Sequence, residues 1–135
     1  MEKVSFSTHS QCEMIDITDE LTAFLARNVN RNWKNGFICV FSPHTTCGVT
    51  INEGYDPDVR DDINDFLTSL IPADWGFQHT EGNSDAHIKT SLVGLHCLVP
   101  VEDGRLALGK WQAAYLCEFD GPRLRTLNLS FLPAE

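Results

Sequence analysis

Short apolar and alternating stretches dominate the hydrophobic pattern of the chain, and they predict β-strands. Residues 37–41 read Phe-Ile-Cys-Val-Phe, a continuous apolar run that follows Asn35-Gly36 and is typical of a fully buried strand. Residues 47–51 alternate between apolar and small or polar side chains, as a half-buried strand requires. The same signals predict further strands at residues 4–9, 12–17, 96–101, 106–108, 111–119 and 124–132.

Two segments carry apolar side chains at helical spacing. Thr18 is expected to cap a helix whose apolar positions continue to Val29, with acidic residues in its first turn. Asp56-Pro57 predicts the start of a second helix, because aspartate is a preferred cap and proline fits the first helical position. The apolar stripe of this second helix continues to Leu70.

A long connection without hydrophobic periodicity follows at residues 73–84, and it is rich in glycine, asparagine and charged groups. Long loops in small domains are often functional, so we expect this segment to contribute to a site. Ser84 or Asp85 is then expected to begin a short helix that ends at Gly94.

These elements predict an α+β fold with a β-sandwich-like core of seven or eight mostly antiparallel strands and two or three helices. Asp103-Gly104 and Asp120-Gly121 are turn signals that each predict a hairpin between neighbouring strands. With 135 residues the chain has the length of one ordinary domain, so residues 1–135 are expected to form a single domain.

The net charge of the chain bears on which classes of partner it can bind. Ten Lys and Arg residues against nineteen Asp and Glu residues give a net charge of −9, which disfavours nucleic acid as a ligand. The sequence begins without a basic segment followed by an apolar run, and it has no apolar stretch of membrane-spanning length. We therefore expect a cytoplasmic protein that binds no membrane.

The five cysteines predict reduced thiols and no disulfide framework, because their number is odd and most of them lie in apolar, strand-like stretches. Cys47 alone borders a polar cluster. It is therefore the one thiol that we consider as a reactive group, with core packing as the alternative.

Three of the five histidines lie in irregular or boundary segments, where site residues tend to be found: His44, His79 and His87. Neutral imidazoles suit zinc and similar ions, and three protein ligands with an open position are typical of a catalytic metal site. The alternative is three separate, hydrogen-bonded or surface histidines. His9 and His96 fall within strand patterns and are interpreted as structural.

Carboxylates gather after the strand at residues 47–51. Helix capping accounts for Asp56 and Asp58. Glu53 ends the strand, and one interpretation is that it points toward the same rim as His44, where it would bind metal or act as a general base. The alternative is a solvated strand end.

Gly109-Lys110-Trp111-Gln112 interrupts the strand pattern with a flexible backbone, a cation, an aromatic surface and an amide. Together these groups could hold a planar heterocycle or a phosphate. The alternative is that Trp111 fills the core and Lys110 is solvated, and Lys89 has the same ambiguity.

Several separated motifs, in this order, resemble the YjbQ-like family over nearly the whole chain. They are His44-Thr45-Thr46, Ile51-Asn52-Glu53, Asp56-Pro57-Asp58, His79 with Glu81-Gly82-Asn83, His87-Ile88-Lys89, and Gly109-Lys110-Trp111-Gln112. This chain departs from the family pattern at Lys110, where threonine is common, at His96, where serine is common, and at Cys47, where alanine is common.

The resemblance implies a compact α+β protein that assembles as a homotrimer, with a histidine-lined pocket near the subunit boundary that often holds a metal or an anion. It implies that His44, His79 and His87 are metal ligands or acid/base groups, that Glu53, Asp56 and Asn83 surround them, and that Trp111 and Gln112 line the pocket. We also expect Thr45 and Lys89 of the matched motifs to contact substrate.

The family resemblance also implies an activity, secondary thiamine-phosphate synthase, which joins a pyrimidine pyrophosphate to a thiazole phosphate. We therefore expect a metal-assisted enzyme that acts on a small phosphorylated heterocycle with a divalent ion, zinc or magnesium. The alternative is a non-catalytic trimeric module that binds a metabolite or a metal through the same pocket.

Overall fold

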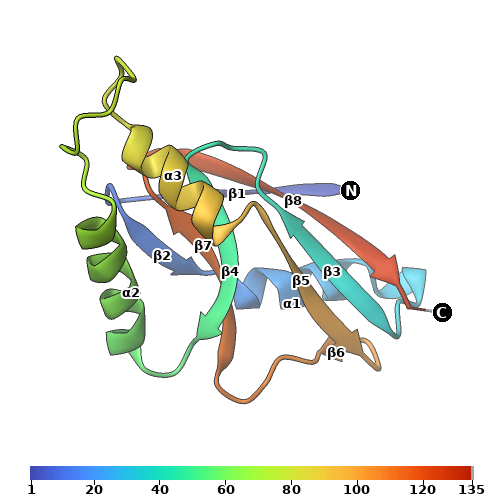
Figure 1. The fold of residues 1–135 in the computed structure, drawn as a ribbon. Coiled ribbons are helices and arrows are strands. Elements are labelled where there is room, and N and C mark those ends of the chain that lie inside the picture. Colours follow the sequence, from blue (N-terminus) through green and yellow to red (C-terminus); the bar gives the residue numbers. More distant parts are fainter. Residues whose placement is uncertain (135) are drawn as a thin grey trace.

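Two antiparallel sheets and three α-helices make up the computed structural model, which describes residues 1–134 (Figure 1). The elements are β1 (Glu2–Ser7), β2 (Glu13–Asp16), α1 (Thr18–Arg27), a 3-10 turn (Val29–Arg31), β3 (Gly36–Phe41), β4 (Cys47–Glu53), α2 (Pro57–Leu70), α3 (Ser84–Val93), β5 (His96–Glu102), β6 (Arg105–Leu106), β7 (Gln112–Glu118) and β8 (Leu124–Pro133). One sheet has the strand order β1-β8-β3-β5-β6 and the other has β2-β7-β4. The predicted α+β fold is therefore confirmed.

The main core lies between the two sheets and is closed along one side by α1. Val40 of β3, Leu116 of β7 and Leu129 of β8 are all fully buried in it, and α1 adds Leu21 and Phe24. Burying one such side chain contributes about 1.5–3 kcal/mol. This core fixes the two sheets against each other and so sets the positions of the loops at their ends.

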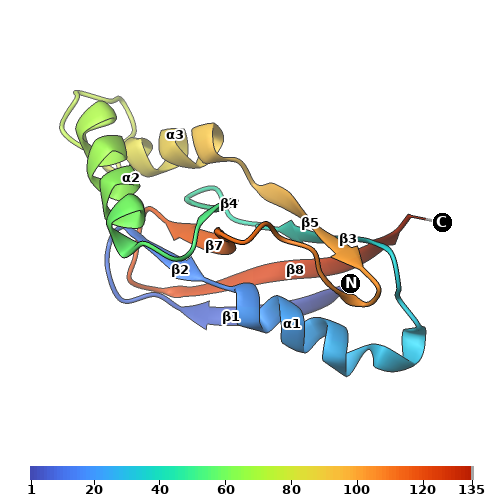
Figure 2. The same cartoon turned by 90° about the horizontal axis from the view of Figure 1, so that it is seen from below.

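A second, smaller core lies on the opposite face of the three-stranded sheet, beneath α2 and α3 (Figure 2). Successive residues of β7 alternate between the two cores: Leu116 belongs to the main core, and Tyr115 and Cys117 belong to the second. The side chains of α2 cover this second core incompletely, since no residue of α2 is fully buried.

The helix starts confirm one predicted cap and correct another. Asp56 caps α2, because its Oδ1 accepts the backbone N–H of Asp58 at 2.9 Å and proline occupies the first turn. Thr18 is the first residue of α1 and not its cap: its backbone N–H donates to Asp16 Oδ1 at 2.9 Å. The Thr18 hydroxyl instead accepts the backbone N–H of Ala114 at 3.0 Å and ties α1 to β7.

One of the two predicted hairpins forms. β5 and β6 pair on either side of Asp103-Gly104, whose positive φ angles of 50° and 76° suit a tight two-residue turn. The hairpin predicted at Asp120-Gly121 is wrong. There the chain crosses from β7 in one sheet to β8 in the other, and Gly121 donates its N–H to the carbonyl of Gln11.

Within residues 1–134, none of the helices has the length and apolar character needed to cross a membrane.

Candidate functional site

The loop between β3 and β4 carries His44 and is held by hydrogen bonds at both ends. Ser42 Oγ donates to the carbonyl oxygen of Cys47 at 2.6 Å and closes the loop on itself. His44 Nε2 lies 3.0 Å from both the backbone nitrogen and the carbonyl oxygen of Thr126 in β8. Because the backbone of β8 engages Nε2, a ligand or substrate would meet His44 at Nδ1.

The surroundings of His44 favour its neutral form. Partial burial lowers the pKa of the His44 imidazole, and the nearby Arg125 guanidinium lowers it further. A neutral imidazole with an accessible nitrogen is the form that can accept a proton or bind a metal ion.

A buried ion pair beneath this loop was not predicted from the sequence. Arg125 of β8 bonds to both carboxylate oxygens of Glu118 at the end of β7, and both side chains are almost completely buried. Arg125 Nη2 also donates to Thr46, to the carbonyl oxygen at 3.1 Å and to Oγ1 at 2.9 Å. The ion pair thus fixes the residue that follows His44-Thr45, and Thr45 itself is exposed.

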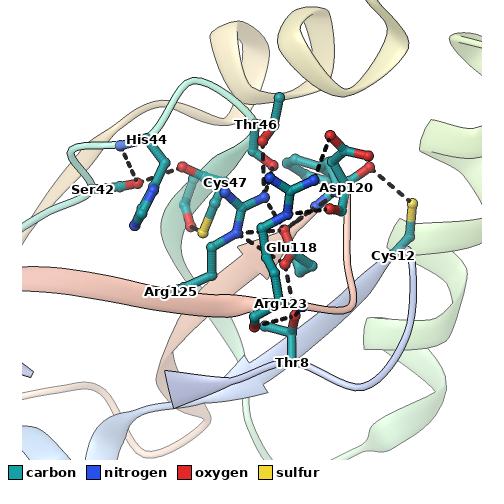
Figure 3. Close-up of polar contacts among 12 residues, drawn as sticks. Thr8, Cys12, Ser42, His44, Thr46, Cys47, Glu118, Asp120, Arg123 and Arg125 are labelled. Atoms are coloured by element: carbon teal, nitrogen blue, oxygen red, sulfur yellow. Dashed lines mark hydrogen bonds and ion pairs between the residues drawn. The ribbon is translucent and has the colours of Figure 1, made fainter. Parts of the chain in front are cut away.

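Further donors complete the environment of the Glu118 carboxylate. Thr8 Oγ1 donates to Oε1 at 2.7 Å, and the backbone N–H groups of Phe119 and Asp120 donate to Oε2 at 3.1 and 3.3 Å (Figure 3). These donors and the guanidinium together offset the cost of burying the carboxylate. The only sequence signal for this pair is that Glu118 and Arg125 share the inward strand register of Leu116 and Leu127.

His79 and His87 are brought together by the long loop and the second turn of α3. Their ring centroids are 5.6 Å apart and the rings meet edge to face. His79 Nε2 lies 3.7 Å from a carboxylate oxygen of Glu81. Imidazole nitrogens are donors that suit zinc, so the two histidines supply part of a metal site.

The predicted three-histidine metal set is not assembled within one chain. Among residues 1–134 there is no group of three or more His, Cys, Asp or Glu side chains placed to hold a metal ion. His44 is bound to the β8 backbone, whereas His79 lies in the loop before α3 and His87 lies in α3. The structure therefore pairs two of the predicted ligands and leaves the third on a separate element.

Asn83 lies directly before α3 and links the helix to the β7–β8 connection. Its Nδ2 donates to Asp120 Oδ2 at 2.9 Å, and Arg123 Nη2 donates to the same oxygen at 3.1 Å. Asn83 Oδ1 is buried and has no hydrogen-bond partner among the described residues. A donor from a ligand or a water molecule would satisfy this oxygen.

Lys89 does not reach the surface at which we expected it to contact substrate. Its side chain is 2% exposed, and its Nζ donates to Asp85 Oδ2 at 3.2 Å, one helical turn earlier. Asp85 is equally buried. The structure therefore corrects this expectation: Lys89 forms a buried ion pair inside α3.

A second polar region lies at the other end of β4. Glu53, Trp111 and Gln112 line a shallow hollow of about 320 Å³. Trp111 is 51% exposed and meets Tyr55 edge to face, with ring centroids 5.1 Å apart, while Lys110 Nζ lies 4.8 Å from the centre of the indole ring. The exposed indole corrects the interpretation of Trp111 as a core residue and leaves an aromatic surface for a ligand.

The interpretation that Glu53 shares a rim with His44 is wrong within one chain. Cys47 and Glu53 are the first and last residues of β4, and six strand steps of about 3.3 Å separate them by about 20 Å. The Glu53 carboxylate accepts the backbone N–H of Tyr55 at 3.3 Å. Asp56, expected near the histidines, acts as the α2 cap at this same end.

Cys47 is a core thiol. It is fully buried, and this burial raises the pKa of the Cys47 thiol to about 12. Iodoacetamide at pH 8 should therefore leave Cys47 unmodified in the native protein and modify it after denaturation in urea, as peptide mass spectrometry would measure. Rapid labelling of Cys47 in the folded protein would contradict this structural role.

The chain resembles known proteins along its full length. A family model described as "UPF0047 protein YjbQ-like" matches residues 2–134. A UPF0047 protein of Methanocaldococcus jannaschii is 46% identical over 130 residues, which cover 96% of this chain and 92% of the relative. The UPF0047 protein YugU of Bacillus subtilis is 43% identical over 135 residues, or 98% of each chain.

Solved structures of similar proteins have the same fold. An uncharacterized conserved protein of the YjbQ/UPF0047 family from Clostridium acetobutylicum superposes with a TM-score of 0.92 at 40% identity and covers 98% of this chain and 100% of its own. A protein of unknown function from Sulfolobus solfataricus gives a TM-score of 0.90 at 28% identity, covering 98% and 95% of the two chains.

Proposed function

The chain belongs to the UPF0047 YjbQ-like family, and from this membership and the geometry of its polar residues we propose that it is an enzyme acting on a small phosphorylated heterocycle. The observation that carries the proposal is the adjacency of the His79 and His87 rings, in a segment that also contains Asn83 with its unsatisfied amide oxygen. Two exposed or half-buried imidazoles at a helix start form a reactive arrangement that the packing of the fold does not require.

In this proposal His79 and His87 hold a divalent ion, zinc or magnesium, and zinc suits two imidazoles better. When bound, the ion would supply positive charge that neutralises a phosphorylated substrate or a leaving diphosphate, which an acidic protein would otherwise repel. His44 offers Nδ1 as an acid/base group or as a further ligand, and its neutral form suits both roles.

The hollow lined by Glu53, Trp111 and Gln112, which we call the Trp111 end of the proposed site, holds the heterocycle. The half-exposed indole offers a stacking surface, and the Gln112 side chain is fixed because its Oε1 accepts the backbone N–H of Gly109 at 2.8 Å. Glu53 borders the same hollow and is our candidate general base. A thiamine-phosphate synthase-like transfer, in which one heterocycle displaces diphosphate from another, would use this division into a phosphate end and a ring end.

A homotrimer is part of the proposal, because the two ends of β4 lie too far apart to share one small substrate within a chain. A partner copy that brings its Trp111 end to His79 and His87 would complete the site. The uncovered face of the five-stranded sheet supports such an assembly. Phe37 and Leu132 lie opposite each other on β3 and β8, Leu98 lies on the same face opposite Cys39, and the three side chains are 39%, 45% and 46% exposed.

Elemental analysis beside the His79→Ala and His87→Ala variants tests the proposal, with His9→Ala as the matched control on an exposed histidine outside the site. We expect about one ion per chain in the parent and the control, and loss of the ion in both site variants. Metal-dependent turnover of a phosphorylated heterocycle should fall about 10²–10⁴-fold in the site variants. Native mass spectrometry of the same samples should give three times the 15.1 kDa chain mass.

Full metal content and full turnover in His87→Ala would refute the assignment of the histidine pair. The second candidate is a trimeric module that binds a phosphorylated metabolite or a metal through the same residues without converting it. Tight binding of a phosphorylated ligand that is recovered unchanged would support that module over the enzyme.

A further inference from the structure

A groove of about 520 Å³ separates α2 from the three-stranded sheet and the end of α3. We propose that it binds a small molecule with an apolar body and a protonated amine. The groove shares only Asn52 with the hollow beside Trp111, and none of its lining residues is a histidine. It is therefore a separate site with a different ligand chemistry from that of the phosphorylated substrate.

The groove exists because α2 does not seat fully on the second core. Ile63 and Leu67 pack against that core and are only half-buried, while Phe66 is 67% exposed. On the facing side the buried side chains of Met14 and Phe119 line the groove. Its volume lies within the range of sites that enclose small organic ligands, and its walls are mostly apolar.

The groove contains an unpaired hydrogen-bond acceptor, so it suits a ligand that donates a hydrogen bond. Asn64 Oδ1 is buried and has no partner in the described part of the chain, which is costly for a polar atom. Asn52 does not offer the same acceptor, because its Oδ1 already accepts the N–H of Glu53 at 2.8 Å. The lining also includes the carboxylate of Asp62 and contains no lysine, arginine or histidine.

The charge around the groove selects a cation over an anion. α2 carries four aspartates, Asp58, Asp61, Asp62 and Asp65, against the single cation Arg60. A protonated amine would donate to Asn64 Oδ1, and the Asp62 carboxylate on the other flank of Ile63 would attract its charge without direct contact. The hydrocarbon part of the ligand would displace water from the apolar wall. A phosphorylated or carboxylated molecule would be repelled by the same residues.

The test uses the assembled protein and three probes of similar shape: 2-phenylethylammonium, 2-phenylethanol and 3-phenylpropanoate. Protein-observed NMR titration should localise the amine to residues of α2 and β7. The amine should bind at least ten-fold more tightly than the alcohol, and the carboxylate should bind more weakly than both. His79→Ala should leave the amine affinity unchanged, so this result is independent of the proposed metal site.

Variants on α2 identify the groups responsible. Asp62→Asn should weaken the amine about ten-fold and leave the alcohol affinity unchanged, because only the amine carries a charge. Asn64→Leu should weaken both probes, because the alcohol hydroxyl also donates to Oδ1. Asp65→Asn is the matched control, because Asp65 has the same charge on the same helix and does not line the groove. Equal affinities for amine and alcohol, an unaffected Asp62→Asn variant, or no binding at all because a second copy covers the groove would each overturn the proposal.

Discussion

Replacing Arg125 by methionine should lower the free energy of unfolding by about 3–5 kcal/mol, because it leaves the Glu118 carboxylate buried without its cation. The arginine is almost completely buried and bonds to both carboxylate oxygens, so its loss cannot be compensated by solvent at that position. Thr46 loses both of its hydrogen bonds from Arg125 Nη2 at the same time. Urea denaturation followed by circular dichroism measures the change.

Arg123→Met is the matched control for this variant. Arg123 lies two residues before Arg125, in the β7–β8 connection, and pairs with Asp120 at 3.1 Å. Its side chain is 51% exposed, and such a pair contributes about 0–1 kcal/mol. The double variant Arg125→Met with Glu118→Gln should recover part of the loss, because glutamine removes the unpaired charge and keeps an acceptor for Thr8. Equal stability of Arg125→Met and Arg123→Met would show that the buried pair is not a stabilising element.

The same substitution connects stability to the site. Thr46 follows directly on the His44 loop, and the Nε2 contacts of His44 to the Thr126 backbone depend on that loop remaining against β8. In Arg125→Met we expect the His44 ring to show altered nitrogen chemical shifts by NMR under conditions where the protein is still folded. Unchanged shifts would mean that the loop is held without the ion pair.

Local sequence patterns were sufficient to predict those elements that are determined by residues within one short segment of the chain. α2 begins after Asp56 and ends at Leu70 as predicted, because a capping aspartate, a proline and an apolar stripe act within the helix itself. β3 and β4 were found from runs of five residues. The Asp103-Gly104 turn was also predictable, since the two residues determine the turn by their own backbone preferences.

Interactions between distant strands were not predictable in the same way. The signal at Asp120-Gly121 is compatible with a hairpin, yet β7 and β8 find their partners in different sheets, and sheet choice depends on the whole topology. Glu118 and Arg125 lie in segments predicted as strands, but only their position between the two sheets buries them. A charged residue within an apolar strand is a signal that could have been used.

The candidate site was predictable in composition more than in arrangement. His79 and His87 lie eight residues apart across a loop, and the short helix predicted after that loop brings their rings together. Glu53 and His44 flank the same strand, and the length of that strand separates them. The motifs therefore identified the candidate residues but not their separation, since within one chain Glu53 and His44 lie near opposite ends of β4.

Lys89→Met should lower the free energy of unfolding by about 3 kcal/mol or more, because Asp85 would remain buried without its partner. The pair lies on the face of α3 that contains the fully buried Ala86, so neither charge can turn into solvent without displacing the helix. Thermal unfolding of the purified variant measures the loss.

The double variant Lys89→Met with Asp85→Asn separates the structural role of Lys89 from the substrate contact expected from its motif. Removing both charges should restore most of the stability, because no unpaired ion remains inside α3. If the lysine acts only through its ion pair with Asp85, the double variant should also keep the affinity of the protein for inorganic diphosphate. Restored stability combined with lost diphosphate binding would instead show that the Lys89 ammonium leaves its buried position to contact the ligand.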